Sequence, residues 1–428
     1  MPVGRNLKDT NVLPPVLVAG YGRSGTSAVM RILATDPHVV FDREYPYEYR
    51  YLAYYAKLSS ILKNRLPDPR FTSDHLYEYG ESVFGPWPWH GHNGGQNVDW
   101  LPIFWEVFSG NAKAADPNVE FYAEKAPVWL APMVRPVLPC FVIDLFRDPR
   151  DVYISSNAFM QKRSYYGFHR KHGDTDINHA RSLGLELLNY FENFVENANL
   201  DQNSFLLRYE DLISDPQKFV AWLQSIGLSP DFDRSFERIG HHQTSLTLEA
   251  SIGRWRREYI PQEVSNFFER HLGREMARLG YPLDEVALCP SFEFRTGQSL
   301  PEVGNPAHGR IAVNQDAMTV YIEGNDFGFF VPSEPIDAES ANEIWVSAAA
   351  NVGDHCSLYW RDADSYFCEE RSIHVNFVPG YHWRIVRFRT SLHPLWTGRI
   401  HQLRIDLFNT NSSEANGLGR VRWIRLIQ

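Results

Sequence analysis

A chain of 428 residues, of which 43% are apolar and 14% aromatic, is longer than one typical compact domain, so we expect two domains. Its 42 Lys and Arg residues against 52 Asp and Glu residues leave a net charge of −10, which argues against a nonspecific nucleic-acid binder and requires any anion site to be local. The four cysteines include no CxxC pair, so the sequence suggests neither a structural zinc site nor a disulfide framework.

The chain begins without the run of about 7 to 15 apolar residues of a signal peptide, and no later stretch approaches the roughly 20 that a membrane helix needs. We therefore expect a cytoplasmic protein with no transmembrane segment.

Strand-like and helix-like segments alternate over the first two thirds of the chain. The apolar run 16–19 predicts a strand, and residues 27–35 follow with apolar positions at helical spacing. Residues 140–146 and 205–209 predict two more buried strands, and residues 181–198 carry the apolar pattern of a core-packed helix. This order predicts an α/β fold with a P-loop-type parallel sheet flanked by helices.

A glycine-rich turn, GYGRSGTS at residues 20–27, lies between the first strand and the first helix. Backbone N–H groups converge at such a helix N-terminus, glycine allows a phosphate to approach closely, and Arg23 adds a positive charge. The hydroxyls of Ser24, Thr26 and Ser27 can donate hydrogen bonds. The loop therefore predicts an anion site, with a ligand-free turn as the alternative.

The loop lacks one residue of a triphosphate site. A Walker A loop reads GxxxxGK[ST], and counting from Gly20 puts Thr26 at the lysine position. Ordinary ATP or GTP hydrolysis is therefore disfavoured.

A second anion site is predicted after the strand at 140–146, in the segment LFRDPRDVYISS. Arg147 stands at the carboxyl end of the strand and Ser155 lies eight residues on, inside the next helix, so both can grip one phosphate. A salt-bridged loop is the alternative.

Together the two segments resemble the sulfotransferase family, in which a GxxRSGTS-type loop binds the 5′-phosphosulfate of 3′-phosphoadenosine-5′-phosphosulfate and an FRDPRDVxxS-type segment binds its 3′-phosphate. The resemblance covers roughly residues 12 to 285. It implies that the donor is held on its 5′ side by Arg23, Ser24, Gly25, Thr26 and Ser27, and at its 3′-phosphate by Arg147 and Ser155.

Two further family features follow in the expected order, RYEDL at 208–212 and SIGRW at 251–255. The resemblance implies that Tyr209 lies near the adenine and that Arg254 belongs to a loop that closes over the donor. Ordinary packing is the alternative for each.

Sulfonyl transfer resembles phosphoryl transfer, so cations and backbone dipoles must stabilise the negative charge on the peripheral and leaving oxygens. Arg23 and the loop amides can do so, and we expect no metal requirement. Lys125 resembles the lysine of the EKxP segment in part of the family, which contacts the leaving oxygen or the transferring group. An exposed lysine paired with Glu124 is the alternative.

A hydroxyl acceptor needs a general base. We choose Glu44, because it follows the strand-like residues 39–41 and has aromatic neighbours that could raise its pKa. Glu48, Asp42, His90 and His92 are rivals, and an exposed salt-bridge partner is the alternative for any one carboxylate.

Beyond a Gly-, Pro- and Asn-rich stretch near residue 300, short alternating runs at 319–322, 343–347 and 384–388 predict an all-β sandwich. The predicted domains are therefore residues 1–295, the P-loop α/β domain, and residues 300–428, the sandwich. The last strands resemble those of jelly-roll carbohydrate-binding modules. Four tryptophans could stack on sugars, although a core position is favoured for each: Trp360, Trp383, Trp396 and Trp423.

The function predicted is sulfonyl transfer from 3′-phosphoadenosine-5′-phosphosulfate to an acceptor hydroxyl on a glycan or glycoside, with adenosine 3′,5′-bisphosphate as product. A P-loop nucleotide or metabolite kinase and a non-enzymatic carbohydrate-binding protein are the alternatives.

Overall fold

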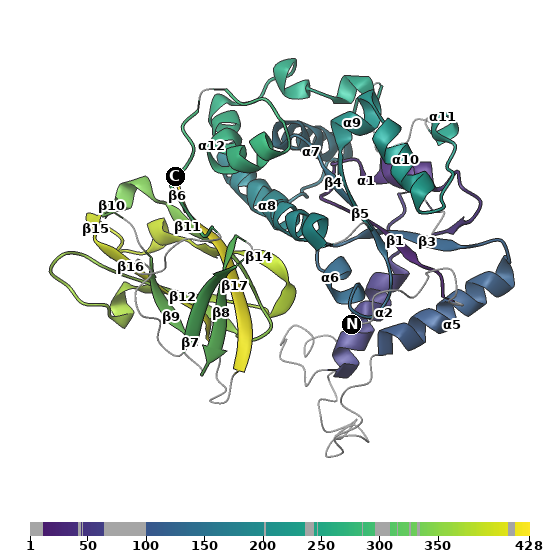
Figure 1. The fold of residues 1–428 in the computed structure, drawn as a ribbon. Helices are drawn as coiled ribbons and strands as arrows, with labels where there is room; N and C mark the ends of the chain where they lie inside the picture. Colours follow the sequence, from purple (N-terminus) through teal and green to yellow (C-terminus); the bar gives the residue numbers. More distant parts are fainter. Residues whose placement is uncertain are drawn as a thin grey trace, which may run out of the picture. The chain divides into compact units, whose positions relative to one another are not determined.

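The computed structural model describes residues 12–41, 44, 46–63, 100–200, 203–235, 244–245, 247–284, 286–295, 309–314, 316–324, 327–331, 334–409 and 416–428. These residues fold into two compact units (Figure 1). Unit 1 comprises the described residues of Met1–Arg147, Ser155–Ser164 and Phe194–Arg254, and unit 2 those of Asp148–Ile154, Tyr165–Asn193 and Trp255–Gln428.

Unit 1 is built on a five-stranded parallel sheet in the order β2-β3-β1-β4-β5. Its strands are β1 (Pro15–Gly20), β2 (Val39–Val40), β3 (Phe121–Ala126), β4 (Phe141–Phe146) and β5 (Ser204–Arg208). The three predicted strands are confirmed as β1, β4 and β5. Because β1 lies between β3 and β4, the chain leaves its carboxyl end where the strand order reverses, and open α/β sheets bind ligands at that point.

Helices flank this sheet, and α1 shows why they do so. Its residues Val29, Met30, Ile32 and Leu33 are buried in one apolar cluster with the strand residues of β1, as their helical spacing requires. The helices that contribute to unit 1 are α1 (Thr26–Leu33), α2 (Tyr51–Lys63), α5 (Trp100–Ala115), α6 (Leu130–Val134), α7 (Pro149–Arg163), α8 (Asp176–Leu200), α9 (Tyr209–Ser214), α10 (Gln217–Ser225) and α11 (Phe232–Ser235).

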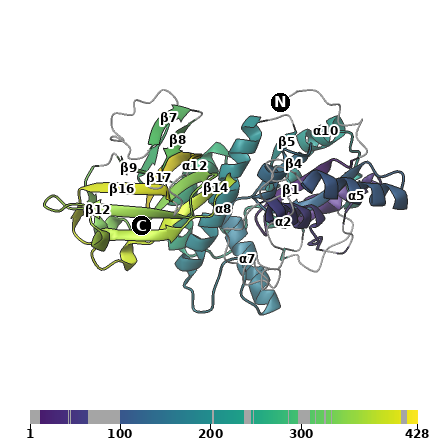
Figure 2. The same ribbon diagram turned by 90° about the horizontal axis from the view of Figure 1, so that it is seen from below.

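Unit 2 contains the predicted sandwich of antiparallel strands (green to yellow in Figures 1 and 2). One sheet has the order β14-β11-β17-β8-β7, with β6 paired to β17; the other has the order β13-β12-β16-β9, and β10 pairs with β15. The strands are β6 (Ser291–Glu293), β7 (Gly309–Asn314), β8 (Ala317–Glu323), β9 (Gly328–Val331), β10 (Ile336–Asp337), β11 (Glu343–Ala350), β12 (His355–Arg361), β13 (Ser372–Asn376), β14 (Gly380–Phe388), β15 (Arg399–Ile400), β16 (Gln402–Asn409) and β17 (Asn416–Ile427). The predicted fold class is confirmed.

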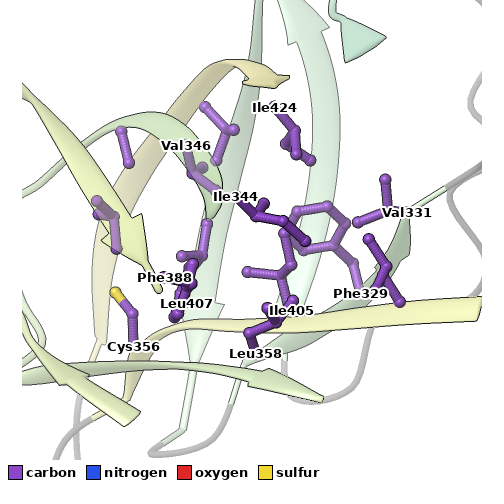
Figure 3. Packing of buried hydrophobic residues seen from close by; sticks show 14 of the residues in the cluster. Phe329, Val331, Ile344, Val346, Cys356, Leu358, Phe388, Ile405, Leu407 and Ile424 are labelled. Carbon is purple, nitrogen blue, oxygen red and sulfur yellow. The ribbon is translucent and has the colours of Figure 1, made fainter. Parts of the chain in front are cut away.

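Alternate residues of the facing strands fill the space between the two sheets. Figure 3 shows Ile344 and Val346 of β11 approaching Leu358 of β12 and Ile405 of β16 within one buried cluster. Trp360 and Trp396 belong to this cluster, with exposed fractions of 0% and 5%. A small sandwich therefore uses these two tryptophans as core.

The other two tryptophans are also buried, but against helices of the same unit. The backbone N–H of Trp383 donates to Asn193 Oδ1 of α8 at 2.9 Å, and Trp423 Nε1 donates to Glu192 Oε1 of the same helix at 2.8 Å. The core positions favoured for all four tryptophans are confirmed. None of the four presents an open ring face to a sugar.

Buried ion pairs hold α8 and α12 (Gln262–Arg278) on the sandwich. Arg422 pairs with Glu192 of α8, and Arg425 Nη2 lies 2.7 Å from Glu275 Oε1 of α12. Both glutamates are less than 5% exposed, so removing an arginine would leave a buried charge without compensation. These two helices are thus part of the same packing unit as the sandwich.

The packing units are not the two predicted domains, because α12 and most of α8 group with the strands that follow residue 300. The predicted boundary itself falls in residues 296–308, which lie outside the described residues. Cys140, Cys289 and Cys356 are buried, whereas Cys368 is exposed. No helix in the described ranges is long and apolar enough to cross a membrane.

Candidate functional site

The glycine-rich turn leads from β1 directly into α1. Ser24 N–H donates to Tyr21 O at 3.1 Å, and Gly25, with φ of 105°, is the N-cap of α1 and provides no side chain to cap it. The first N–H groups of a helix have no intrahelical acceptor, so this end of α1 is open to an anion. Ser24 Oγ is buried and has no hydrogen-bond partner in the described part of the chain. The loop therefore fits a phosphate group.

Two glycines of the turn are needed for steric reasons. A Cβ on Gly20 would lie 2.9 Å from Leu145 O, and a Cβ on Gly25 would lie 2.3 Å from Cδ2 of the Tyr209 ring. Arg23, between them, has φ of 73°, a left-handed conformation that non-glycine residues seldom adopt. Such strain is typical of ligand-binding loops.

Arg23 of the first anion segment contacts Ser155 of the second. Its Nε donates to Ser155 Oγ at 3.2 Å, and its guanidinium lies 4.7 Å from the centroid of the Phe159 ring. Ser155 is 1% exposed and lies in α7, one turn before Phe159. The structure therefore brings together residues that are 132 positions apart in sequence.

Arg147 follows β4 and is 4% exposed. Its Nη1 donates to Arg23 O at 2.9 Å, its Nη2 donates to Ser251 O, and its guanidinium lies 4.7 Å from the centroid of the Tyr209 ring. Arg147 thus supports the strained residue of the phosphate loop and also lies against the tyrosine that packs on Gly25.

The segment that carries Arg254 completes the cluster. Arg254, 3% exposed, donates from Nη1 to Thr244 Oγ1 at 3.0 Å, and Thr244 Oγ1 lies 3.2 Å from Ser155 Oγ. Tyr209 OH and Ser251 Oγ are 2.8 Å apart. Three guanidinium groups and several hydroxyls therefore converge in unit 1, the chemistry that binds phosphate oxygens.

Sequence reasoning missed Thr244. It lies ten residues before Arg254 and belongs to none of the motifs, so only the fold reveals its contact with Ser155. Ser251 stood within the SIGRW motif, but the motif itself does not show that its carbonyl accepts from Arg147. Thr26 and Ser27, predicted from the loop, are the first two residues of α1.

The alternative given for the second segment was a salt-bridged loop, and Arg150 of this segment does form salt bridges. Arg150 is fully buried, and it pairs with Asp148 Oδ2 and with Glu269 Oε1, each at 2.7 Å. Its guanidinium also lies 3.6 Å from the centroid of the Trp255 ring. Arg150 is thus a structural residue of unit 2, whereas Arg147 in unit 1 donates to two backbone carbonyls and lies against an aromatic ring.

Lys125 is not the exposed partner of Glu124 that the alternative described. It is 6% exposed and its Nζ lies 2.8 Å from Glu48 Oε1. Burial lowers the pKa of Lys125, the nearby charges of Arg50 and Arg23 lower it further, and Glu48 opposes them. The alternative was wrong because neighbouring strand residues point to opposite faces of the sheet.

Glu124 occupies the other face of β3 and is 1% exposed. It accepts hydrogen bonds from Tyr122 OH at 2.5 Å, Leu52 N–H at 2.9 Å and Ala53 N–H at 3.1 Å. Burial raises its pKa to about 7 against the opposing effect of these hydrogen bonds. Sequence reasoning gave Glu124 no role beyond pairing with a lysine.

The candidate bases have different surroundings. Glu44 is exposed, and its carbonyl oxygen accepts from Tyr47 N–H at 2.7 Å. Glu48 is half exposed and lies between two cations, Lys125 and Arg50, with Arg50 Nη2 2.9 Å from Glu48 Oε2. Three of the predicted rivals lie outside the described residues: Asp42, His90 and His92.

Among the residues that the structure describes, no group of three or more His, Cys, Asp or Glu side chains could hold a metal ion.

Comparison with known proteins gives one family match. Residues 14–226 match the model of the Sulfotransferase family. This range contains both anion segments and Lys125, and it ends before Thr244 and Arg254. No curated protein matches the chain.

Several solved structures resemble the chain at low sequence identity. The sulfotransferase domain from the curacin biosynthetic pathway is 14% identical, with a TM-score of 0.37, and the match covers 64% of this chain and all of that one. A low-affinity xylan-binding module, CBM86 from Roseburia intestinalis, is 10% identical, with a TM-score of 0.24 and coverage of 33% and 95%. A mutant of a family 29 carbohydrate-binding module is 7% identical, with a TM-score of 0.23 and coverage of 32% and 91%.

Proposed function

Because residues 14–226 of this chain belong to the sulfotransferase family, we propose that it transfers a sulfonyl group from 3′-phosphoadenosine-5′-phosphosulfate to a hydroxyl group of a glycan. The observation that carries the proposal is the contact between the two anion segments through Arg23, Arg147 and Ser155. Two phosphate-binding segments in contact suit a donor that carries phosphate at both its 5′ and 3′ positions. ATP has no 3′-phosphate to use the second segment.

In this proposal the donor's 5′ side lies on the N-terminus of α1, where the loop amides, Ser24, Thr26 and Ser27 donate hydrogen bonds to it. Arg147 and Ser155 bind the 3′-phosphate, and Arg254 closes the site from the next segment. Bound donor supplies the activated sulfonyl group. Arg23 and Lys125 place positive charge near the leaving oxygen, so that charge developing there is stabilised.

The contacts of Glu48 support it as the general base in preference to Glu44, the base chosen from sequence. Glu48 is the carboxylate that reaches Lys125, and Lys125 lies close enough to Arg23 for the charge of Arg23 to lower its pKa. A base at this position would take the proton of an acceptor hydroxyl beside the donor's cations.

Substituting the two carboxylates separately tests this assignment. Glu48→Gln is expected to lower turnover about 10² to 10⁴-fold, the usual contribution of a general base, with little change in affinity for adenosine 3′,5′-bisphosphate. Glu44→Gln is the matched control and is expected to keep most of the activity. The reverse pattern would restore Glu44 as the base.

A polar and aromatic cluster on the sandwich, in which Arg404, Phe330 and Phe367 are partly exposed and Tyr359 and Asp406 are buried, supports a glycan as the acceptor. On the outer face of β12, β16 and β9, the Arg404 guanidinium lies 4.2 Å from the centroid of the Tyr359 ring and donates to both carboxylate oxygens of Asp406, at 2.9 and 2.7 Å. Phe330 and Phe367 stack beside it with ring centroids 5.6 Å apart. Aromatic rings beside charged hydrogen-bonding groups are suited to sugar rings, which have apolar faces and polar edges.

A thermal-shift titration tests the donor assignment. Adenosine 3′,5′-bisphosphate is expected to raise the melting temperature, whereas ATP with magnesium is not, because a ligand stabilises the fold that binds it. Stabilisation by ATP alone would support a kinase, and no response to either would support a non-enzymatic binding protein. Mass spectrometry for added sulfonate on a panel of saccharides then tests the acceptor.

A further inference from the structure

One short stretch of chain, residues 48–53, is held by β3 from both faces of the strand. On one face Lys125 Nζ pairs with Glu48 Oε1 at 2.8 Å. On the other face Glu124 accepts from the N–H groups of Leu52 and Ala53, at 2.9 and 3.1 Å. Tyr122 OH, two residues back on the same face as Glu124, accepts from Tyr51 N–H at 3.3 Å.

These contacts replace a helix cap that the local sequence lacks. Helix α2 starts at Tyr51, and neither the preceding Arg50 nor the first turn supplies the Ser, Thr, Asp or Asn oxygen that usually caps a helix. The carboxylate of Glu124 fills this role from another element and places negative charge at the positive end of the helix. A helix start fixed in this way fixes the backbone just before it.

Keeping a carboxyl group at this position is costly. Glu124 is 1% exposed, and burying a charged group without full compensation disfavours folding. A glutamine that filled the same space would avoid this cost, but it has one acceptor oxygen, whereas Glu124 accepts from Leu52 N–H on Oε2 and from Ala53 N–H on Oε1. The two carboxylate oxygens of Glu124 therefore fix the N-terminus of α2.

We infer that Glu124 is a positioning residue for sulfonyl transfer, because it anchors the start of α2 and thereby holds Glu48 on Lys125 beside the phosphate loop. This inference rests on the proposed function. Glu124 itself is buried on the face of β3 opposite Lys125. In the register of β3 on β1, Lys125 lies opposite Val18 and Ala126 lies opposite Ala19. The ion pair of Lys125 and Glu48 therefore lies beside β1, the strand that leads into the phosphate loop.

The substitution Glu124→Gln tests the inference, with Glu120→Gln as the matched control because Glu120 is exposed just before β3. In Glu124→Gln we expect turnover to fall about 100-fold, the effect of displacing a reacting group by an ångström, with no change in affinity for adenosine 3′,5′-bisphosphate. We also expect faster hydrogen exchange at the amides of residues 51–56 and unchanged exchange at residues 20–27. Turnover is measured as release of the bisphosphate from the donor, with a polysaccharide mixture and with water alone.

The pH dependence separates positioning from general stability. Burial raises the pKa of Glu124 to about 7, and the hydrogen bonds from Tyr122 OH and from the N–H groups of Leu52 and Ala53, together with the charge of Arg50, lower it. The carboxylate form, present above that pH, is the better acceptor for the two amides, so wild-type turnover is expected to fall as pH drops below about 7. Tyr122→Phe removes a hydrogen bond that lowers this pKa, so the fall should move to higher pH, and in Glu124→Gln it should be absent.

Wild-type turnover in Glu124→Gln, or lower turnover with unchanged exchange at residues 51–56, would overturn the inference. If Glu124→Gln does not fold, the shifted pH profile of Tyr122→Phe decides, and an unshifted profile counts against the positioning role. A wild-type protein that neither binds the bisphosphate nor turns over the donor would instead refute the proposed function. The hydrogen-exchange comparison would still report whether Glu124 anchors α2.

Discussion

Arg147→Ala is expected to weaken binding of adenosine 3′,5′-bisphosphate about 100-fold, because charged hydrogen bonds to a phosphate contribute roughly 1.5 to 3 kcal/mol each. The side chain has two tasks in the structure. Its guanidinium lies beside Ser251 and Tyr209, where a 3′-phosphate would be bound, and its Nη1 supports the backbone of Arg23. Isothermal titration calorimetry on the purified variant measures the loss.

Adenosine 5′-phosphate, which lacks the 3′-phosphate, is the matched ligand. Its affinity should fall less than that of the bisphosphate, because only the support of Arg23 is lost for it. Equal losses for both nucleotides would mean that Arg147 acts through the phosphate loop alone. Arg150→Ala is no substitute as a control, because Arg150 is fully buried between Asp148 and Glu269 and its removal would destabilise unit 2.

Gly25→Ala is expected to abolish measurable donor binding. Alanine at φ of 105° is strained by about 1 to 3 kcal/mol. Its Cβ would also overlap the ring of Tyr209, at 2.3 Å from Cδ2. Tyr209 is 5% exposed and is held by the contact of its hydroxyl with Ser251, so the loop must move instead of the ring. Calorimetric titration with the bisphosphate, together with a thermal melt, measures both effects.

Gly173→Ala isolates the backbone part of that effect. Gly173 has φ of 85°, and a Cβ there would meet no atom within 4 Å. We expect a lower melting temperature in this variant with donor affinity unchanged. Wild-type donor affinity in Gly25→Ala would show that the donor does not use the α1 N-terminus.

Much of unit 1 could be predicted from the sequence because its signals are local. A buried strand appears as an apolar run, and a phosphate loop appears as glycines between a strand and a helix. The second anion segment appears as an arginine at a strand end followed by a serine inside the next helix. Arg23, Arg147 and Ser155 were chosen on these grounds, and the fold brings them into contact. The antiparallel sandwich was likewise predicted from short alternating runs of residues. The burial of its tryptophans was predicted from the preference of large rings for the core.

Several features depended on which strands become neighbours, which no local pattern records. The order β2-β3-β1 places β3 beside the strand that leads into the phosphate loop. The face of β3 from which each side chain points then decides its partner: Lys125 pairs with Glu48, and Glu124 accepts from the first N–H groups of α2. Thr244 meets Ser155 across 89 residues of sequence.

The sequence by itself thus determined the fold class and predicted the two anion segments that the fold brings into contact, since periodicity and turn chemistry act over a few residues. Only the tertiary structure decided the partners of Lys125, the burial of Glu124 and the attachment of α8 and α12 to the sandwich. These depend on contacts between distant segments, in which a side chain's partner and its pKa follow from what the complete fold places around it.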